Sequence, residues 1–187
     1  MKMKKLLAVV LTGVMAVSML TGCASVKTRD IAKDLEGMLK GVNGKANVTA
    51  TNDADNLSDK AAKKLNGKTV LNAAQIKTNV DTALESELKK TDEYVWYTTF
   101  ETKGLNNTEQ ARQIKAMLIA NDAINTAGAA NKAVVANIKK DNKTYKPTAG
   151  NNFELGISSF SMGEGAAKKD YVVVVVTCKA VASTEEA

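Results

Sequence analysis

The sequence predicts an α+β domain in which several amphipathic helices pack on a small antiparallel sheet. Apolar residues recur every three or four positions in residues 31–42 and 76–88, which is the period of a helix with one buried face. Residues 93–101 and 171–182 are instead rich in β-branched and aromatic residues, as strands are. The resulting order is helices, one strand, more helices and two strands, which is typical of the α+β class.

Three helices are expected in the first half of the chain, over residues 28–41, 56–67 and 72–88. Asn72 and Gln75 have the spacing of a capping box at the start of the third helix. A longer helical stretch is predicted over residues 107–140, opened by a cap at Asn107 and Gln110 and interrupted near Gly128. The expected loops are residues 45–55, 141–151 and 163–170, and the acidic residues 183–187 are expected to fray.

The strands are expected at residues 93–101, 153–162 and 171–182, the last two forming a hairpin. Five consecutive valines, residues 172–176, leave no polar face on the last strand. That pattern suits a strand buried on both sides at the centre of a sheet.

Residues 1–22 have the organisation of a bacterial export signal. Lys2, Lys4 and Lys5 precede an apolar run over residues 6–20, which is too short to cross a bilayer comfortably as a helix. The run ends in Leu-Thr-Gly-Cys at residues 20–23, which resembles the lipobox of bacterial lipoproteins. The resemblance implies cleavage before Cys23 and a diacylglycerol group on its sulfur. Two acyl chains bind a membrane stably, so the expected location is the extracytoplasmic face of the cell membrane.

On this interpretation Cys23 and residues 24–27 form a lipidated start and a short tether. Residues 28–182 form a single globular domain, and residues 183–187 form an acidic tail. Removal of the signal leaves 165 of the 187 residues, enough for one domain with its own core. The signal holds three of the 26 basic residues and none of the 20 acidic residues, so the mature chain carries a net charge of +3. No segment concentrates this charge, and we expect no nucleic-acid partner.

The residue types present limit the chemistry of the domain. The chain has no histidine, which excludes Ser-His-Asp and Cys-His nucleophile systems and histidine zinc sites. If Cys23 is lipidated, Cys178 has no partner for an intramolecular disulfide. Cys178 shares strand parity with Val172, Val174 and Val176, so we expect it in the core rather than as a reactive thiol. No cofactor and no resident metal are expected.

Two groups of acidic residues are candidate sites. Asn52, Asp53, Asp55 and Asp59 could offer oxygen ligands to Ca2+, but the spacing lacks the glycine and the final glutamate of an EF-hand, and a solvated acidic loop is favoured. Glu93 and Glu101 would lie about 27 Å apart on a straight strand, too far for paired carboxylate chemistry.

Aromatic residues in the strand at 93–101 could form a stacking surface for a sugar or a peptide. Trp96 and Tyr97 are the candidate ligand-binding residues, and Tyr97 is the better candidate for exposure. The alternative, which the pattern favours, is that these rings fill the core.

The two ends of the globular part resemble the CAP superfamily of secreted proteins. The resemblance rests on Leu57-Ser-Asp-Lys-Ala-Ala near the start, and on Asn137-Ile138, Phe153 to Ile157 and the valine run near the end. It implies an α-β-α sandwich. The cleft histidines and the GEN-type motif of the family have no counterpart here, so no site residue is carried over.

These observations favour a non-enzymatic, surface-tethered module that binds an envelope protein, an envelope polymer or an extracellular ligand. The alternatives are a divergent CAP-like secreted domain and an enzyme that uses carboxylates or lysine on envelope polymer. An enzyme is the less favoured interpretation, because the usual catalytic bases are missing from the sequence.

Overall fold

The computed structural model describes residues 26–120 and 131–186. Cys23, the expected signal peptide and the predicted helix interruption near Gly128 lie outside the described residues. Within them, no helix is long and apolar enough to cross a membrane.

One mixed sheet forms the centre of the domain. Its strand order is β1-β4-β5-β2, with β3 paired to β4 beyond one end of β1. The strands are β1 (Asn47–Ala50), β2 (Glu93–Glu101), β3 (Ile138–Lys140), β4 (Lys143–Met162) and β5 (Lys169–Glu186). All pairs are antiparallel except β1 with β4, which is parallel. The α+β class is therefore confirmed, and the expectation of a wholly antiparallel sheet is wrong at β1.

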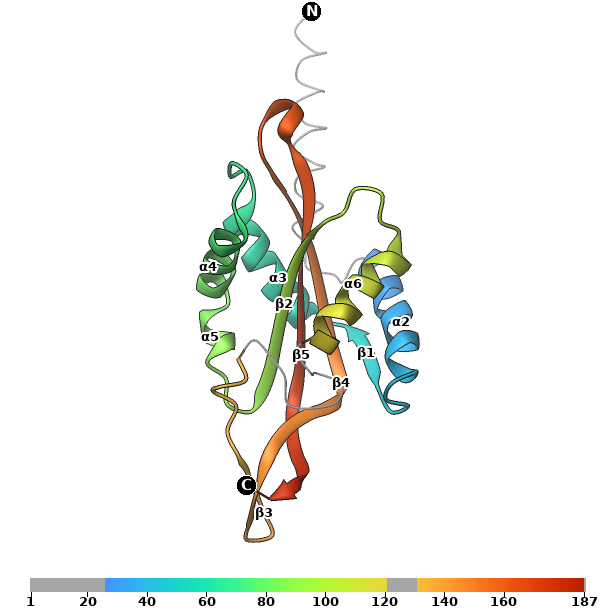
Figure 1. The fold of residues 1–187 in the computed structure, drawn as a ribbon, viewed down its shortest axis with the longest axis vertical. Coiled ribbons are helices and arrows are strands. Elements are labelled where there is room, and N and C mark those ends of the chain that lie inside the picture. The colour runs from blue at the N-terminus through green and yellow to red at the C-terminus, as the bar shows by residue number, and fades with distance from the viewer. Residues whose placement is uncertain (1–25, 121–130, 187) are drawn as a thin grey trace, which may run out of the picture.

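The sheet is covered by helices on both faces, giving three layers (Figure 1). Helices α2 (Val26–Lys40) and α6 (Asn107–Ala120) lie on one face, and α3 (Asn52–Leu65), α4 (Ala73–Ala83) and α5 (Glu85–Leu88) lie on the other.

The valine run of β5 explains this arrangement. Val172, Val174 and Val176 belong to the core cluster under α2 and α6, whereas Val173 and Val175 belong to the cluster under α3 and α4. Successive side chains of a strand point to opposite faces, so a strand with no polar face needs cover on both. The predicted central position of this strand is confirmed, since β5 lies between β4 and β2.

Helix α3 lies along the outer edge of β4 and supplies partners that another strand would otherwise supply. Asp55 Oδ1 accepts the Ile157 N–H at 3.1 Å, and Asn66 Oδ1 accepts the Ser161 N–H at 3.0 Å. Next to the first of these contacts the backbones come very close, because a Cβ on Gly156 would lie 2.0 Å from the Ala54 carbonyl oxygen. Glycine is therefore required at position 156 for α3 to sit where it does.

Residues 45–55 are not the loop that was predicted. Residues 47–50 form β1, and α3 begins at Asn52, with Thr51 as its N-cap, instead of at Asn56. Asn-Val-Thr-Ala is too short to show a clear strand pattern. It becomes a strand because β4 offers it a parallel partner, with Val48 opposite Phe153.

The second half of the predicted 107–140 helix is also wrong. Helix α6 is described over Asn107–Ala120, whereas residues 131–137 form turns and irregular backbone and residues 138–140 form β3. The predicted loop at 141–151 forms the start of β4, joined to β3 by Asp141 and Asn142, which both have positive φ angles (52° and 61°). Asp and Asn tolerate this region well, and two such residues suit the twist of a tight hairpin.

Smaller differences concern helix ends and the tail. The predicted capping box of Asn72 and Gln75 is confirmed, but the helix breaks at Leu84 into α4 and α5. The cap of α6 lies one residue earlier than predicted, since Asn106 and Glu109 exchange backbone-to-side-chain hydrogen bonds. Residues 183–186, expected to fray, continue strand β5.

We expect Gly156→Ala to lower the free energy of unfolding by about 3 kcal/mol, because the new Cβ must displace the first turn of α3. Gly37→Ala is the matched control. Nothing lies within 4 Å of a Cβ at this position inside α2, so alanine should stabilise the helix by about 0.5–1 kcal/mol. Urea unfolding of both variants would test this, and equal stability of the two would contradict the close contact.

Candidate functional site

A groove runs between helix α4 and strand β2, with a volume of about 380 Å³. Helix α4 contributes Ala73, Ile76 and Lys77, the strand contributes residues 97–100, and Tyr171 of β5 completes the lining. Successive side chains of a strand point to opposite faces, so a surface formed by four consecutive residues lies along its edge. We call this surface the α4–β2 groove.

Along the groove, no strand of the described residues pairs with the outer edge of β2. β2 is the last strand in the sheet order. Asn131 covers its beginning, where Asn131 Oδ1 accepts the Val95 N–H at 2.8 Å and Asn131 Nδ2 donates to the Glu93 carbonyl at 2.8 Å.

Outward and inward N–H groups alternate along a strand, so the N–H groups of Tyr97, Thr99 and Glu101 point outward, as that of Val95 does. No partner for these three groups is found in residues 26–120 and 131–186. An edge of this kind presents the hydrogen-bonding pattern of a strand without its neighbour.

Tyr97 forms part of this groove, and its ring is fixed in place. The side chain is half-buried, and its hydroxyl donates a hydrogen bond to Asp81 of α4, which also pairs with Lys77. Burial and the hydrogen bond to Asp81 raise the pKa of Tyr97, so the phenol remains a donor at physiological pH.

Trp96 lies in a different place from Tyr97. It has no exposed surface and packs between Tyr94 and Phe153, with ring centroids 5.6 Å and 6.2 Å away. The structure therefore places one of the two predicted ligand-binding residues in a surface groove and the other in the core on the opposite face of the sheet.

A second hollow, of about 390 Å³, lies between α3, α5 and the end of the sheet. We call it the charged pocket. Its floor is formed by Glu93 of β2, Thr177 of β5 and Glu154 of β4. The other charged residues of its lining are Asp53, Lys60, Glu87, Lys90 and Lys179.

Glu93 is the most buried charge of this pocket, at 7% exposed, and it is compensated. Lys90 Nζ lies 2.7 Å from Glu93 and 2.6 Å from Glu87, and Lys179 Nζ lies 4.0 Å from Glu93. Burial lowers the pKa of Lys90, but its hydrogen bonds to Glu87 and Glu93 outweigh this effect and raise the pKa above its ordinary value. Lys90 is therefore a fixed cation that compensates Glu87 and Glu93.

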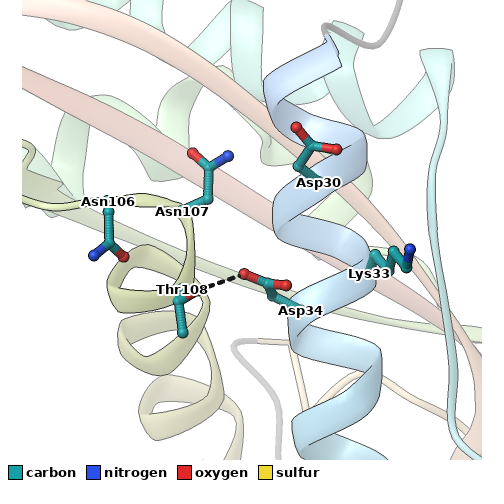
Figure 2. Close-up of a pocket in the computed structure, with 6 residues that line it drawn as sticks. All are labelled: Asp30, Lys33, Asp34, Asn106, Asn107 and Thr108. Atoms are coloured by element: carbon teal, nitrogen blue, oxygen red, sulfur yellow. Dashed lines mark hydrogen bonds between the residues drawn. The ribbon is translucent and has the colours of Figure 1, made fainter.

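A third hollow lies between residues 30–34 of α2 and the first turn of α6 (Figure 2). Thr108 Oγ1 donates to Asp34 Oδ2 at 2.7 Å, which ties the two helices together. Lys33 points away from α6, and the Asn106 side chain is used in the cap of α6. We assign this hollow a structural role.

The other residues weighed as sites have local roles. Asp55 is buried and bonded to β4, Asp59 pairs with Lys63 at 3.0 Å, and Glu101 pairs with Lys169 at 2.8 Å. Among the described residues, no group of three or more acidic or cysteine side chains is placed to hold a metal ion. Cys178 is buried in the core as predicted, and desolvation raises the pKa of its thiol to about 12.

The sequence indicated Tyr97 but not the groove or the charged pocket. The groove depends on which strand is at the edge of the sheet, and strand order has no local signal in this sequence. The pocket combines five elements, and only the short spacing of Lys90 and Glu93 could have suggested a local ion pair.

No protein-family model matches this chain, and no curated protein or solved structure is significantly similar to it. The resemblance to the CAP superfamily therefore stays a prediction. Its implied three layers agree with the observed arrangement, but layers alone are shared by unrelated folds.

Tyr97 and Tyr94 provide a matched pair for testing this geometry. Tyr97→Phe removes the hydrogen bond to Asp81 and should cost about 1–2 kcal/mol of stability. The Tyr94 hydroxyl is buried and has no hydrogen-bond partner among the described residues, so Tyr94→Phe should leave stability unchanged or raise it by about 1 kcal/mol. Thermal unfolding followed by circular dichroism would separate the two, and an equal loss in both variants would contradict the assignment.

Proposed function

We propose that the protein is a lipid-anchored, extracytoplasmic binding module that holds an extended peptide segment of an envelope partner in the α4–β2 groove. The observation that carries this proposal is the unpaired edge of β2 along a groove formed by residues 97–100. The location rests on the export signal and the lipobox that ends at Cys23.

A peptide added as a strand next to β2 would use both the strand edge and the apolar side chains of the groove. A peptide next to β2 would exchange main-chain hydrogen bonds with Tyr97, Thr99 and Glu101, and these bonds supply affinity without depending on the peptide sequence. Alternate peptide side chains would contact the apolar parts of Ile76 and Tyr171. Such contacts supply selectivity, and Lys77 at the rim favours a peptide with a nearby acidic group.

The carboxylate geometry favours binding over catalysis. Glu93 and Glu101 lie at opposite ends of β2, each in its own ion pair. Glu93 and Glu154 share the floor of the charged pocket, but Glu93 is neutralised by Lys90, and Glu154 accepts the Thr51 hydroxyl at 3.0 Å. Glu93 is therefore not free to act as an acid or a base, and Glu154 has no second free carboxylate beside it on the floor to form the pair that an enzyme acting on envelope polymer would need.

The peptide site can be tested by photo-crosslinking in intact cells, with a photoreactive amino acid at position 77 in the groove. We expect an adduct to one extended segment of an envelope protein. The same group at Arg112, an exposed residue of α6 on the other face, is the positional control.

Thr99→Pro gives the decisive comparison. It removes an outward N–H that β5 does not use, so the strand should tolerate it at the edge while strand addition is blocked. Thr99→Val keeps the N–H and should keep the adduct. Survival of the adduct in Thr99→Pro, an equal adduct from position 112, or no adduct from position 77 would refute the proposal, provided that circular dichroism shows a folded variant.

The anchor has its own test. Cys23→Ala should release the protein from membranes or leave it as the unprocessed precursor, because no sulfur remains to carry the lipid. Membrane fractionation and the mass of the mature chain would show this. A processed, membrane-bound Cys23→Ala protein would rule out lipidation at this position.

A further inference from the structure

Thr177 at the floor of the charged pocket has a buried side-chain hydroxyl that no described residue binds. It is 4% exposed, and no hydrogen bond to its hydroxyl is found among the described residues. Among the described residues, the completely buried side-chain polar atoms that lack a hydrogen-bond partner are the Tyr94 hydroxyl and Gln110 Oε1. The Thr177 hydroxyl is not one of them, so it keeps a small exposed surface toward the pocket that Thr177 lines. A buried hydroxyl that lacks a protein partner can hydrogen-bond a bound molecule instead.

Glu154 stands next to this hydroxyl. It lies directly opposite Thr177 in the β4–β5 register, so the two side chains are neighbours on the same face of the sheet. Glu154 accepts the Thr51 hydroxyl with one carboxylate oxygen, Oε2. No cation pairs with Glu154 in the part of the chain that the structure describes, so the carboxylate can also bind a cationic group.

The remaining charges of the pocket are not balanced within it. Lys90 pairs with Glu87 and Glu93, and Lys179 pairs with Asp92 at 3.5 Å and lies 4.0 Å from Glu93. Asp53, Glu154 and Lys60, by contrast, form no ion pair with the described residues. Two carboxylates and one ammonium group therefore face the pocket uncompensated. The complementary ligand carries two ammonium groups and one carboxylate.

We infer that the charged pocket is a second binding site, for a small diamino monocarboxylic acid. One ligand ammonium contacts Glu154 and donates to Thr177, and the second contacts Asp53 at the first turn of α3. The ligand carboxylate faces Lys60, about two turns further along the same helix. The site shares no lining residue with the α4–β2 groove and does not depend on the function proposed for that groove.

L-Lysine is the probe that tests this inference, added to the full-length protein purified in detergent. Its binding should be saturable by isothermal titration calorimetry, with a Kd in the millimolar range or tighter for a ligand of this size. Glu154→Gln should weaken binding about ten-fold or more, because it removes the charge that faces the ligand ammonium. Thr177→Val, which keeps the shape of the side chain, should weaken it about three-fold or more.

Two analogues of L-lysine test which group of the ligand contacts which residue of the pocket. Cadaverine lacks the carboxylate, so Lys60→Ala should weaken L-lysine but not cadaverine. Norleucine lacks the second ammonium, so it should bind more weakly than L-lysine and be insensitive to Asp53→Asn. Glu85→Gln, on the exposed side of α5 and outside the lining, is the control that should bind L-lysine as the unchanged protein does.

The outcomes separate cleanly. The inference is overturned if L-lysine shows no saturable binding at about 10 mM, or if Glu154→Gln and Thr177→Val bind it as well as Glu85→Gln does. Comparable circular dichroism spectra for all variants would ensure that a loss of binding is not a loss of fold.

Discussion

At Gly156 the backbone of helix α3 lies against the backbone of strand β4, and much of the molecule depends on this contact. Thr51, Asp55 and Asn66 hold the helix to the strand on both sides of the glycine. The helix takes the position of a further strand, so the β-ladder at this edge is limited to β1 and β3. It also buries the odd-numbered valines of β5 and forms one wall of the charged pocket.

The two edges of the sheet therefore differ in how far they are covered. The β4 edge is filled by β1, β3 and α3, whereas the β2 edge is covered by the side chain of Asn131 at its beginning and is otherwise open in the described chain. Natural sheets usually protect their edges against unplanned pairing. An open edge next to a groove with a fixed tyrosine is a place where pairing with a partner is useful. Glu93 and Tyr97 lie about 13 Å apart along β2, so one strand contributes to both proposed sites.

Sequence patterns were reliable where the cause of the structure is local. The valine run predicted a doubly buried strand, and the Asn72–Gln75 box predicted a helix start, because side-chain period and capping act over a few residues. They failed for residues 47–50 and 143–151, whose strand conformation comes from their partners. Asn47 pairs with Asn152, and Val181 pairs with Thr148, contacts that no short window contains. The helix predicted over residues 134–140 failed for the same reason, since β3 is formed by its hairpin with β4.

By itself the sequence determined the α+β class, the central strand, the buried position of Cys178 and the absence of histidine chemistry. It also predicts the export signal and the lipid anchor. The tertiary structure decided which strand edge is open, that Tyr97 lines a groove while Trp96 is buried, and that Thr177, Glu93 and Glu154 share a pocket. The physical reason is distance along the chain. Thr51 and Glu154 are 103 positions apart, and only the packing of a helix onto a strand brings such residues into one site.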